Sequence, residues 1–428
     1  MVESAVAHVE SDPLRAAPAA LDLPAGDMDS SDLAAFALHV REQLAVMYPA
    51  ELRDPAVKSH PEAVWGGRAF AHSDDPQILW MRRMAEQGWT APHWPRVYGG
   101  GGLTPAQAQV LLGELEAGGY REPLKHWVWM LGSALLEFAS EAQKHEHLPK
   151  IIRGDIRWCQ GYSERGAGSD LAGLQTKCED KGDHWLINGS KIWTSWANLA
   201  DWCFCLVRTD AAKKHEGISF VLIDMTSPGV ETAAISLISG DSQFCETFFT
   251  DVKIPKENLV GQVGGGWSIA KRLLQFERQE YGGLEEGAGT AGGSDGDLAD
   301  IARQYSGETG QLLDGDLRAR ITRNKMDFQS FRLTVARLAA EAEAGGGPSA
   351  KSSIFKFAGA EFAQQRSELI VEAMGGQGLG WEPQGFTSDE VVASRGWLRS
   401  KANSIEGGSS EVSLNIIAKR VLGLPDAT

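Results

Sequence analysis

Residues 187–210 read INGSKIWTSWANLADWCFCLVRTD, and this stretch sets the class of fold that we expect. Its second half, DWCFCLVRT, is a short apolar run with aromatic and β-branched residues, bounded by turn residues, as is typical of a β-strand. Similar runs, HWLING, GISFVLIDM and ETFFTDVKI, lie before and after it. We therefore expect an antiparallel β-domain over residues 156–262.

The segments on both sides of this β-domain have helical periodicity. SDLAAFALHVREQL starts with a capping residue and repeats its apolar positions at three and four, and TPAQAQVLLGELEAGG begins with Thr-Pro and ends with Gly-Gly. The helical period returns after residue 266 in WSIAKRLLQFERQEY and later segments. This order predicts an α+β fold, with helical domains over residues 31–155 and 263–428, and not an alternating parallel nucleotide-binding sheet.

Composition and charge exclude several classes of partner. The chain has 428 residues and a formal net charge of -16, which argues against a nucleic-acid surface. Its apolar runs are too short for a membrane span. Residues 1–30 are rich in Ala, Pro and Asp and predict a loose arm, not a secretory signal or transit peptide, so we expect a cytoplasmic protein. The five cysteines form no C-x-x-C pair and are expected to be reduced packing residues.

Three short segments contain candidate chemical groups. SERGAGSD, at residues 163–170, is either a cofactor loop or an ordinary tight turn, because it lacks the Lys-Ser/Thr of a phosphate loop. Trp193 in KIWTSW is either a core residue or an aromatic surface for a ligand. His145 and His147 are spaced by two, which puts them on different sides of a helix and disfavours a metal site.

Glu277 is a candidate base because it lies in the apolar stripe of a helix. Charged residues are rarely buried without a partner, so Glu277 either meets a structural partner or is a desolvated carboxylate suited to taking a proton. Glu406 in SIEGGSSEVSLN, beside Gly407, is the second candidate. The stripe around Glu277 is formed by Trp267, Ala270, Leu273, Leu274, Tyr281 and Leu284.

Taken together and in this order, four motifs resemble the acyl-CoA dehydrogenase family. They are WCQGYSERGAGSDLAGLQTK, INGSKIWTSWANLADWCFCLVRTD, GISFVLIDM…PGV and SIEGGSSEVSLNIIAKRVLGLP. The resemblance implies a helical N-terminal domain, a middle β-domain and a C-terminal four-helix-bundle domain. It also implies bound FAD, oxidation of the Cα–Cβ bond of an acyl-CoA in fatty acid or steroid catabolism, electron-transfer flavoprotein as partner, and a homotetramer or heterotetramer.

The resemblance also implies roles for individual residues. Ser169 lines the acyl-CoA channel and Arg278 lies beside the substrate. Trp193 packs against the flavin and Ser195 bonds near its N5 atom, whereas Arg303, Glu372 and Gly376 reach the FAD of a neighbouring subunit. The implied cofactor-binding residues are Tyr162, Ser163, Trp193, Thr194, Ser195, Arg303, Glu372, Gly376, Gly407 and Ser409.

This sequence departs from the family pattern in three places. Arg165 stands where members usually have proline, the Arg-Lys-Thr-Phe-Gly motif around Arg303 is largely lost, and a Gly-rich interruption occupies residues 287–297. Acyl-CoA oxidase, flavin monooxygenase and a non-catalytic subunit of a heterotetramer therefore stay as alternatives.

Alignment also bears on the base. Many members have it in the C-terminal loop, where this chain has Gly407, with Glu406 one position earlier. A second group has it on the helix that corresponds to LLQFERQE, just before an arginine, and Glu277 followed by Arg278 fits that pattern. Glu277 is therefore the favoured base, and Glu406 is the alternate.

Overall fold

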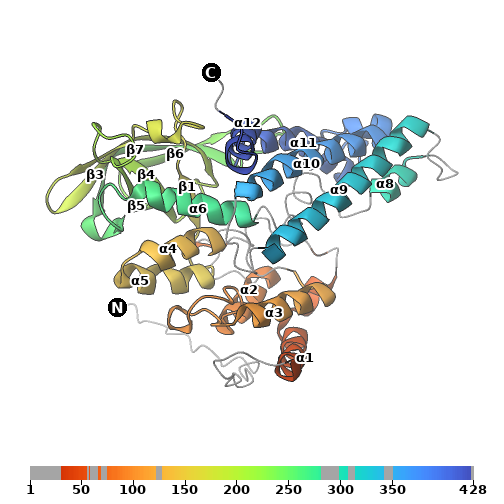
Figure 1. The fold of residues 1–428 in the computed structure, drawn as a ribbon, viewed down its shortest axis with the longest axis horizontal. Helices are drawn as coiled ribbons and strands as arrows, with labels where there is room; N and C mark the ends of the chain where they lie inside the picture. Colours follow the sequence, from red (N-terminus) through yellow and green to blue (C-terminus); the bar gives the residue numbers. More distant parts are fainter. Residues whose placement is uncertain are drawn as a thin grey trace, which may run out of the picture.

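The computed structural model describes residues 30–54, 57, 66–68, 75–121, 128–280, 298–306, 314–341 and 350–425. Figure 1 shows a β-sheet at one end of the molecule, long C-terminal helices at the other, and N-terminal helices along one side of both. The predicted α+β order of helices, sheet and helices is confirmed. The domain boundaries stay predictions, and residues 1–29 of the predicted arm and the Gly-rich interruption lie outside the described residues.

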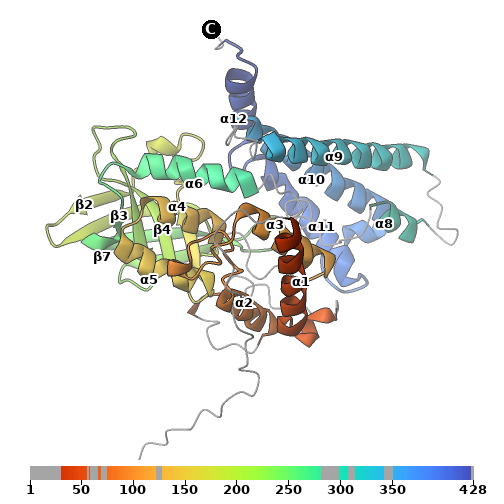
Figure 2. The same ribbon diagram turned by 60° about the horizontal axis from the view of Figure 1, so that its bottom comes forward.

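The N-terminal helices begin at strong capping signals. Thr104 and Gln107 cap α3 reciprocally, since each side chain accepts a hydrogen bond from the other residue's backbone N–H. The helix predicted to start at Thr-Pro and to stop at Gly-Gly does so. Figure 2 shows this group of helices beside the sheet and the C-terminal helices. The group consists of α1 (Ser30–Met47), α2 (Pro76–Glu86), α3 (Pro105–Ala117), α4 (Ser133–Phe138) and α5 (Glu141–Ile152).

Eight strands of the described residues form one sheet in the order β6-β7-β3-β2-β4-β5-β8, with β1 paired to β4. Most pairs are antiparallel, as predicted, but β1 runs parallel to β4, and β2 meets the end of β4 in parallel. The prediction of a purely antiparallel sheet is therefore wrong at these two places. The strands are β1 (Trp158–Gly161), β2 (Lys177–Asp180), β3 (His184–Ser195), β4 (Trp202–Arg208), β5 (Ile218–Asp224), β6 (Val230–Ile235), β7 (Phe244–Pro255) and β8 (Leu259–Val260).

Both faces of the middle of the sheet are buried. Along β4, Phe204 and Leu206 pack into a core shared with α4, α5 and α6, whereas Cys203, Cys205 and Val207 pack into a second core on the other face. This double burial explains why DWCFCLVRT is apolar almost throughout and does not alternate with polar residues. All five cysteines are free and buried, as expected of packing residues.

The C-terminal region is helical and is organised around α10. This helix packs against α8, α9, α11 and α12, and α9 meets it through the rings of Phe328, Phe331, Phe355 and Phe362. α6 connects the sheet with this region (Figure 1). The helices are α6 (Gly266–Glu280), α8 (Leu298–Gln304), α9 (Gly315–Glu341), α10 (Ser353–Met374), α11 (Ser388–Ser400) and α12 (Ser410–Ile416).

The predicted apolar stripe of α6 faces the core. Ala270 and Leu273 are fully buried, and Trp267 and Leu274 pack partly buried beside them. Ile269 is also buried, which the stripe did not include. Tyr281 and Leu284 lie outside the described residues. None of the helices in the described ranges is long and apolar enough to cross a membrane.

His147 and His145 lie in different surroundings, as their spacing predicted. His145 is exposed and contacts the ring of Tyr98, whereas His147 is buried between Trp158 and Trp202, with ring centroids 5.3 and 5.0 Å away. Burial disfavours the charged imidazolium and lowers the pKa of His147 from its usual value to about 4. The folded protein therefore keeps His147 neutral at a pH where an unfolded chain protonates it.

This difference predicts a loss of stability in mild acid. Between pH 6.5 and about 4 the unfolded state binds a proton at His147 that the folded state does not, so the free energy of unfolding falls as the pH falls, by up to about 3 kcal/mol. Denaturant titrations across this window should give a flatter pH dependence for His147→Phe than for wild type. His145→Phe is the control, and equal slopes for His147→Phe and wild type would refute the assignment.

Candidate active site

A β-bulge near the end of β3 presents Trp193 to solvent. Lys191 pairs with Thr247 on β7 and Thr194 pairs with Cys245, so three steps along β3 oppose two along β7. Trp193 lies within this irregularity with φ 61°, and its side chain is 53% exposed. A left-handed backbone is rare for a bulky residue and occurs preferentially at functional sites. We call residues 192–194 the Trp193 bulge.

The loop of residues 163–169 lies directly against the Trp193 bulge. It contains a tight turn in which Glu164 and Ala167 exchange two backbone hydrogen bonds of 3.0 Å. The carbonyl oxygen of Ser163 accepts a 2.9 Å hydrogen bond from the backbone N–H of Ile192. Tyr162 is buried just before this loop, whereas Ser169 at its end is exposed. Ser163, Thr194 and Ser195, which were singled out from the sequence, therefore belong to adjoining segments.

A buried ion pair lies where the loop meets β3. The Lys191 ammonium is completely buried and donates to Glu164 Oε1 at 2.8 Å and to the Tyr162 carbonyl at 3.1 Å. Glu164 also accepts hydrogen bonds from Thr176 and from the backbone N–H of Gln175. Burial opposes ionisation of the Glu164 carboxyl, but the Lys191 charge and these hydrogen bonds outweigh it and lower the pKa of Glu164.

The C-terminal loop, residues 405–409, reaches the Trp193 bulge through Arg399. The Arg399 guanidinium donates to both carboxylate oxygens of Glu406, at 2.8 and 3.3 Å, and lies over the ring of Phe244 at 5.3 Å. The Phe244 ring contacts Trp193 edge-on at 6.2 Å. The structure thus brings together two segments that the sequence analysis assigned to one site. Arg399 and Phe244 were not predicted, because no local pattern marks a contact between residues so far apart in the chain.

The backbone of the C-terminal loop suits a sharp turn into α12. Gly407 and Gly408 have φ of 63° and 96°, in the left-handed region that glycine adopts at little cost. The Ser409 side chain caps α12 by accepting a hydrogen bond from the backbone N–H of Val412. Glycines and serine therefore have conformational roles here, next to Glu406.

Glu277 and Arg278 lie on α6, and their side chains are outside the described residues. Position 277 follows the buried Leu273 by one helical turn, so its place on the helix agrees with the predicted stripe.

The predicted contacts to a neighbouring subunit involve residues of the C-terminal helices. Arg303 is exposed and pairs with Asp300 on α8. Glu372 on α10 accepts a 2.7 Å hydrogen bond from Arg320 on α9. Gly376 lies in the 3₁₀ turn that ends α10. Among the described residues, the polar contacts of Arg303 and Glu372 stay within these helices.

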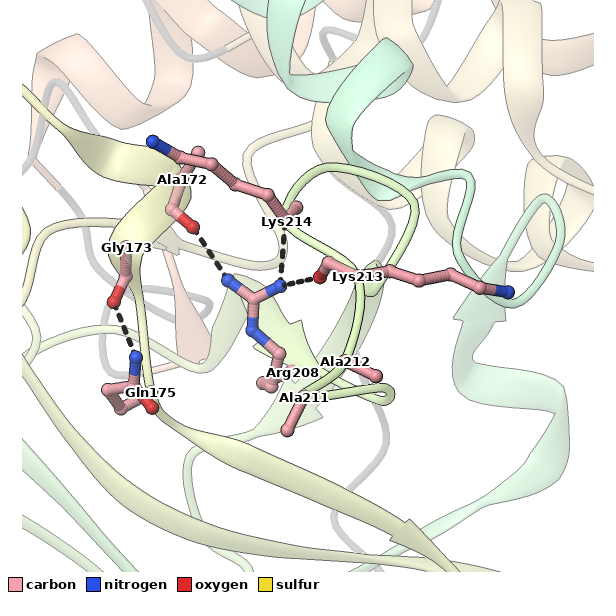
Figure 3. Close-up of a pocket in the computed structure, with 8 residues that line it drawn as sticks. All are labelled: Ala172, Gly173, Gln175, Arg208, Ala211, Ala212, Lys213 and Lys214. Carbon is pink, nitrogen blue, oxygen red and sulfur yellow. Dashed lines mark hydrogen bonds between the residues drawn. The ribbon is translucent and has the colours of Figure 1, made fainter.

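A surface cavity of about 320 Å³ begins three residues beyond Ser169. Figure 3 shows the Arg208 guanidinium on its floor, with the side chains of Lys213 and Lys214 extending away in opposite directions. Arg208 donates to the carbonyl oxygens of Ala172, Leu174, Lys213 and Lys214, and so ties two loops together. Arg208 is therefore a structural joint, and the exposed lysines give the cavity a cationic rim.

Fold and site together define a class of protein. Residues 57–155, 159–252 and 264–422 match the N-terminal, middle and C-terminal domains of acyl-CoA dehydrogenases. The chain belongs to the acyl-CoA dehydrogenase family, whose members are flavoprotein oxidoreductases that act on CH–CH groups, and the resemblance seen in the sequence is confirmed.

Individual relatives match most of this chain. Acyl-CoA dehydrogenase IpdE1 of Mycolicibacterium smegmatis is 35% identical over 379 residues, which cover 84% of this chain and 91% of IpdE1. Acyl-CoA dehydrogenase FadE34 of Mycobacterium tuberculosis is 36% identical over 344 residues, which cover 80% of this chain but 45% of FadE34, so the match spans less than half of that protein.

Solved structures share the fold over nearly the whole chain. The Tcur3481-Tcur3483 steroid acyl-CoA dehydrogenase has a TM-score of 0.72 at 26% identity and covers 94% of this chain and 99% of that one. The ChsE4-ChsE5 complex from Mycobacterium tuberculosis has a TM-score of 0.69 at 26% identity, with the same coverage of 94% and 99%.

The buried Lys191–Glu164 pair predicts a large effect of removing one partner. Lys191→Met leaves a buried carboxylate without its counter-ion and should lower the free energy of unfolding by about 3–5 kcal/mol. Adding Glu164→Gln should recover part of this loss. Lys150→Met, which breaks an exposed pair with Glu146, is the control and should cost less than about 1 kcal/mol. If the single and double variants are equally destabilised in chemical denaturation, charge is not the cause.

Proposed function

We propose that this protein is an FAD-dependent acyl-CoA dehydrogenase in which Glu277 takes the α-proton of the thioester. When bound, FAD would supply the acceptor for the β-hydride at its N5 atom. The observation that carries the proposal is the convergence of the 163–169 loop, the Trp193 bulge and the C-terminal loop. These are the segments to which the family resemblance gives flavin contacts.

The residues of the Trp193 bulge fit a flat cofactor. Trp193 offers an exposed aromatic surface on a strained backbone, which packing within the described chain does not require. The Thr194 hydroxyl is buried without a hydrogen-bond partner among the described residues, so a polar ligand group could satisfy it. Tyr162, Ser163, Ser195, Gly407 and Ser409 would complete the cofactor contacts.

The contacts of Glu406 support Glu277 as the base. Glu406 is held by two hydrogen bonds from Arg399, so taking a proton would break an ion pair. The position that carries the base in many members is Gly407, whose φ of 63° favours glycine over a carboxylic residue. Position 277 on α6 is free of both objections.

The chain's own groups would then prepare the substrate for proton removal. An α-proton of a thioester is weakly acidic, and oriented hydrogen-bond donors at its carbonyl oxygen lower the cost of the enolate-like transition state. The base must be held in a near-attack position on the face of the substrate opposite the hydride acceptor. Ser169 and Arg278 would contact the acyl-CoA. The match to a protein described as a steroid acyl-CoA dehydrogenase supports a steroid or fatty acyl group.

Two other roles on the same fold can be separated from this one. An acyl-CoA oxidase or flavin monooxygenase would consume oxygen with substrate, whereas a dehydrogenase passes electrons to an electron-transfer flavoprotein. A non-catalytic subunit would purify colourless and silent with every acyl-CoA. Sedimentation of the same sample would test the homotetramer or heterotetramer that we propose, in which Arg303, Glu372 and Gly376 would meet a neighbour's FAD.

FAD binding is tested first. The purified chain should show the visible spectrum of a flavoprotein, and Trp193→Ala should retain FAD less tightly, because an aromatic contact is worth about 0.5–1.5 kcal/mol beyond burial. Trp196→Ala is the control, since Trp196 shares the left-handed backbone but lies beside Arg157. Retention equal to wild type in Trp193→Ala would mean that this ring does not contact the cofactor.

The base is tested by isosteric substitution. General-base catalysis typically contributes about 10²–10⁴-fold, so Glu277→Gln should slow flavin reduction by acyl-CoA by at least about 10²-fold while FAD stays bound. Glu406→Gln should slow it far less. Anaerobic stopped-flow reduction of both variants decides, and a dead Glu406→Gln beside a near-normal Glu277→Gln would reverse the assignment.

A further inference from the structure

Arg165 links the 163–169 loop to β7. Its Nε atom donates to Glu246 Oε1 at 2.8 Å, and its Nη2 atom donates to Oε2 at 2.7 Å. This bidentate geometry fixes direction as well as distance. The Arg165 side chain is 73% exposed and that of Glu246 only 12%, so a mobile surface arginine is held by an anchored carboxylate.

Glu246 lies across from the Trp193 bulge. On β7 it stands between Cys245, which pairs with Thr194, and Thr247, which pairs with Lys191. The ion pair therefore joins the loop to the strand position that faces the register shift. The hydrogen bond from Ile192 to Ser163 makes a second tie at the other side of the same bulge.

The loop needs such a tie because its own sequence constrains it little. Arg165 occupies the second position of the Glu164–Ala167 turn, where proline is favoured because its ring fixes φ. Gly166 and Gly168 follow, and no atom lies within 4 Å of the place where a Cβ would stand on either. Of residues 165–170, Ala167 alone is buried. Neither backbone restriction nor packing holds this exposed segment.

We propose that Arg165 is a positioning residue whose ion pair with Glu246 fixes the 163–169 loop relative to Trp193. The role rests on the proposed function, because these two segments are the ones that we assign to the flavin. Arg165 acts through the loop and does not itself contact the cofactor. An ion pair thus supplies the rigidity that a proline would give to this turn.

The test compares FAD affinity and the flavin absorption spectrum across four variants. Arg165→Ala and Glu246→Gln should each weaken FAD binding by about fivefold and shift the visible flavin bands, while thermal unfolding confirms that both fold. The double variant should be no weaker than either single one, because both remove the same interaction. Arg165→Pro should bind FAD nearly as wild type does, since the ring restores the constraint without the charge.

Arg41→Ala is a matched control for the loss of a bidentate surface pair. Arg41 and Glu114 form the same two-bond arrangement, at 2.8 and 2.7 Å, between α1 and α3, with side chains 64% and 14% exposed. Arg41→Ala should leave FAD affinity and spectrum unchanged.

Two results would overturn the positioning role. One is an Arg165→Ala variant that binds FAD as Arg41→Ala does, with an unchanged spectrum. The other is an Arg165→Pro variant as weak as Arg165→Ala, which would mean that the guanidinium acts on the cofactor directly. A wild-type chain that takes up no FAD would instead overturn the proposed function, so the two failures are distinguishable.

Discussion

The buried ion pair between Lys191 and Glu164 is the constraint on which the candidate site depends. A completely buried ammonium must have its charge and its hydrogen bonds satisfied, and Lys191 finds both in Glu164 and the Tyr162 carbonyl. These partners lie at the end of β1 and in the loop that follows it, so the demand of one side chain fixes where that loop runs. Lys191 also stands immediately before the Trp193 bulge. The polar requirement of the interior therefore sets the relative position of two surface segments.

Side-chain ties of decreasing burial extend outward from this pair. Arg165 holds the tip of the loop to β7 through Glu246, at the surface. Arg399 holds the C-terminal loop through Glu406 and covers Phe244, which in turn contacts Trp193. Arginine suits these positions because a planar guanidinium can bond a carboxylate and lie over an aromatic ring at once. The site is thus assembled from segments of three parts of the chain, each held by its own cation.

Local sequence patterns predicted the elements well but not their contacts. The start of α3 at Thr104 and the burial of Ala270 and Leu273 follow from capping and from a period of 3.6, which are properties of a few neighbouring residues. The left-handed backbone at Trp193 follows from the register of β3 against β7, and no local pattern records that register. The parallel pairing of β1 with β4 was missed for the same reason. Glu406 illustrates the difference, since its sequence context suggests a base and its partner Arg399 does not.

The double burial of the sheet also has a consequence for thiol chemistry. Burial raises the pKa of the Cys178 thiol to about 12, and the pKa values of Cys203 and Cys205 are raised well above the usual value. A thiol reacts with alkylating agents and oxidants as its thiolate, so these side chains are both inaccessible and chemically inert near neutral pH. All five native cysteines are buried in this way within the described chain. A single cysteine introduced at a surface position would therefore be the selective attachment point for a spectroscopic probe, without removal of any native thiol.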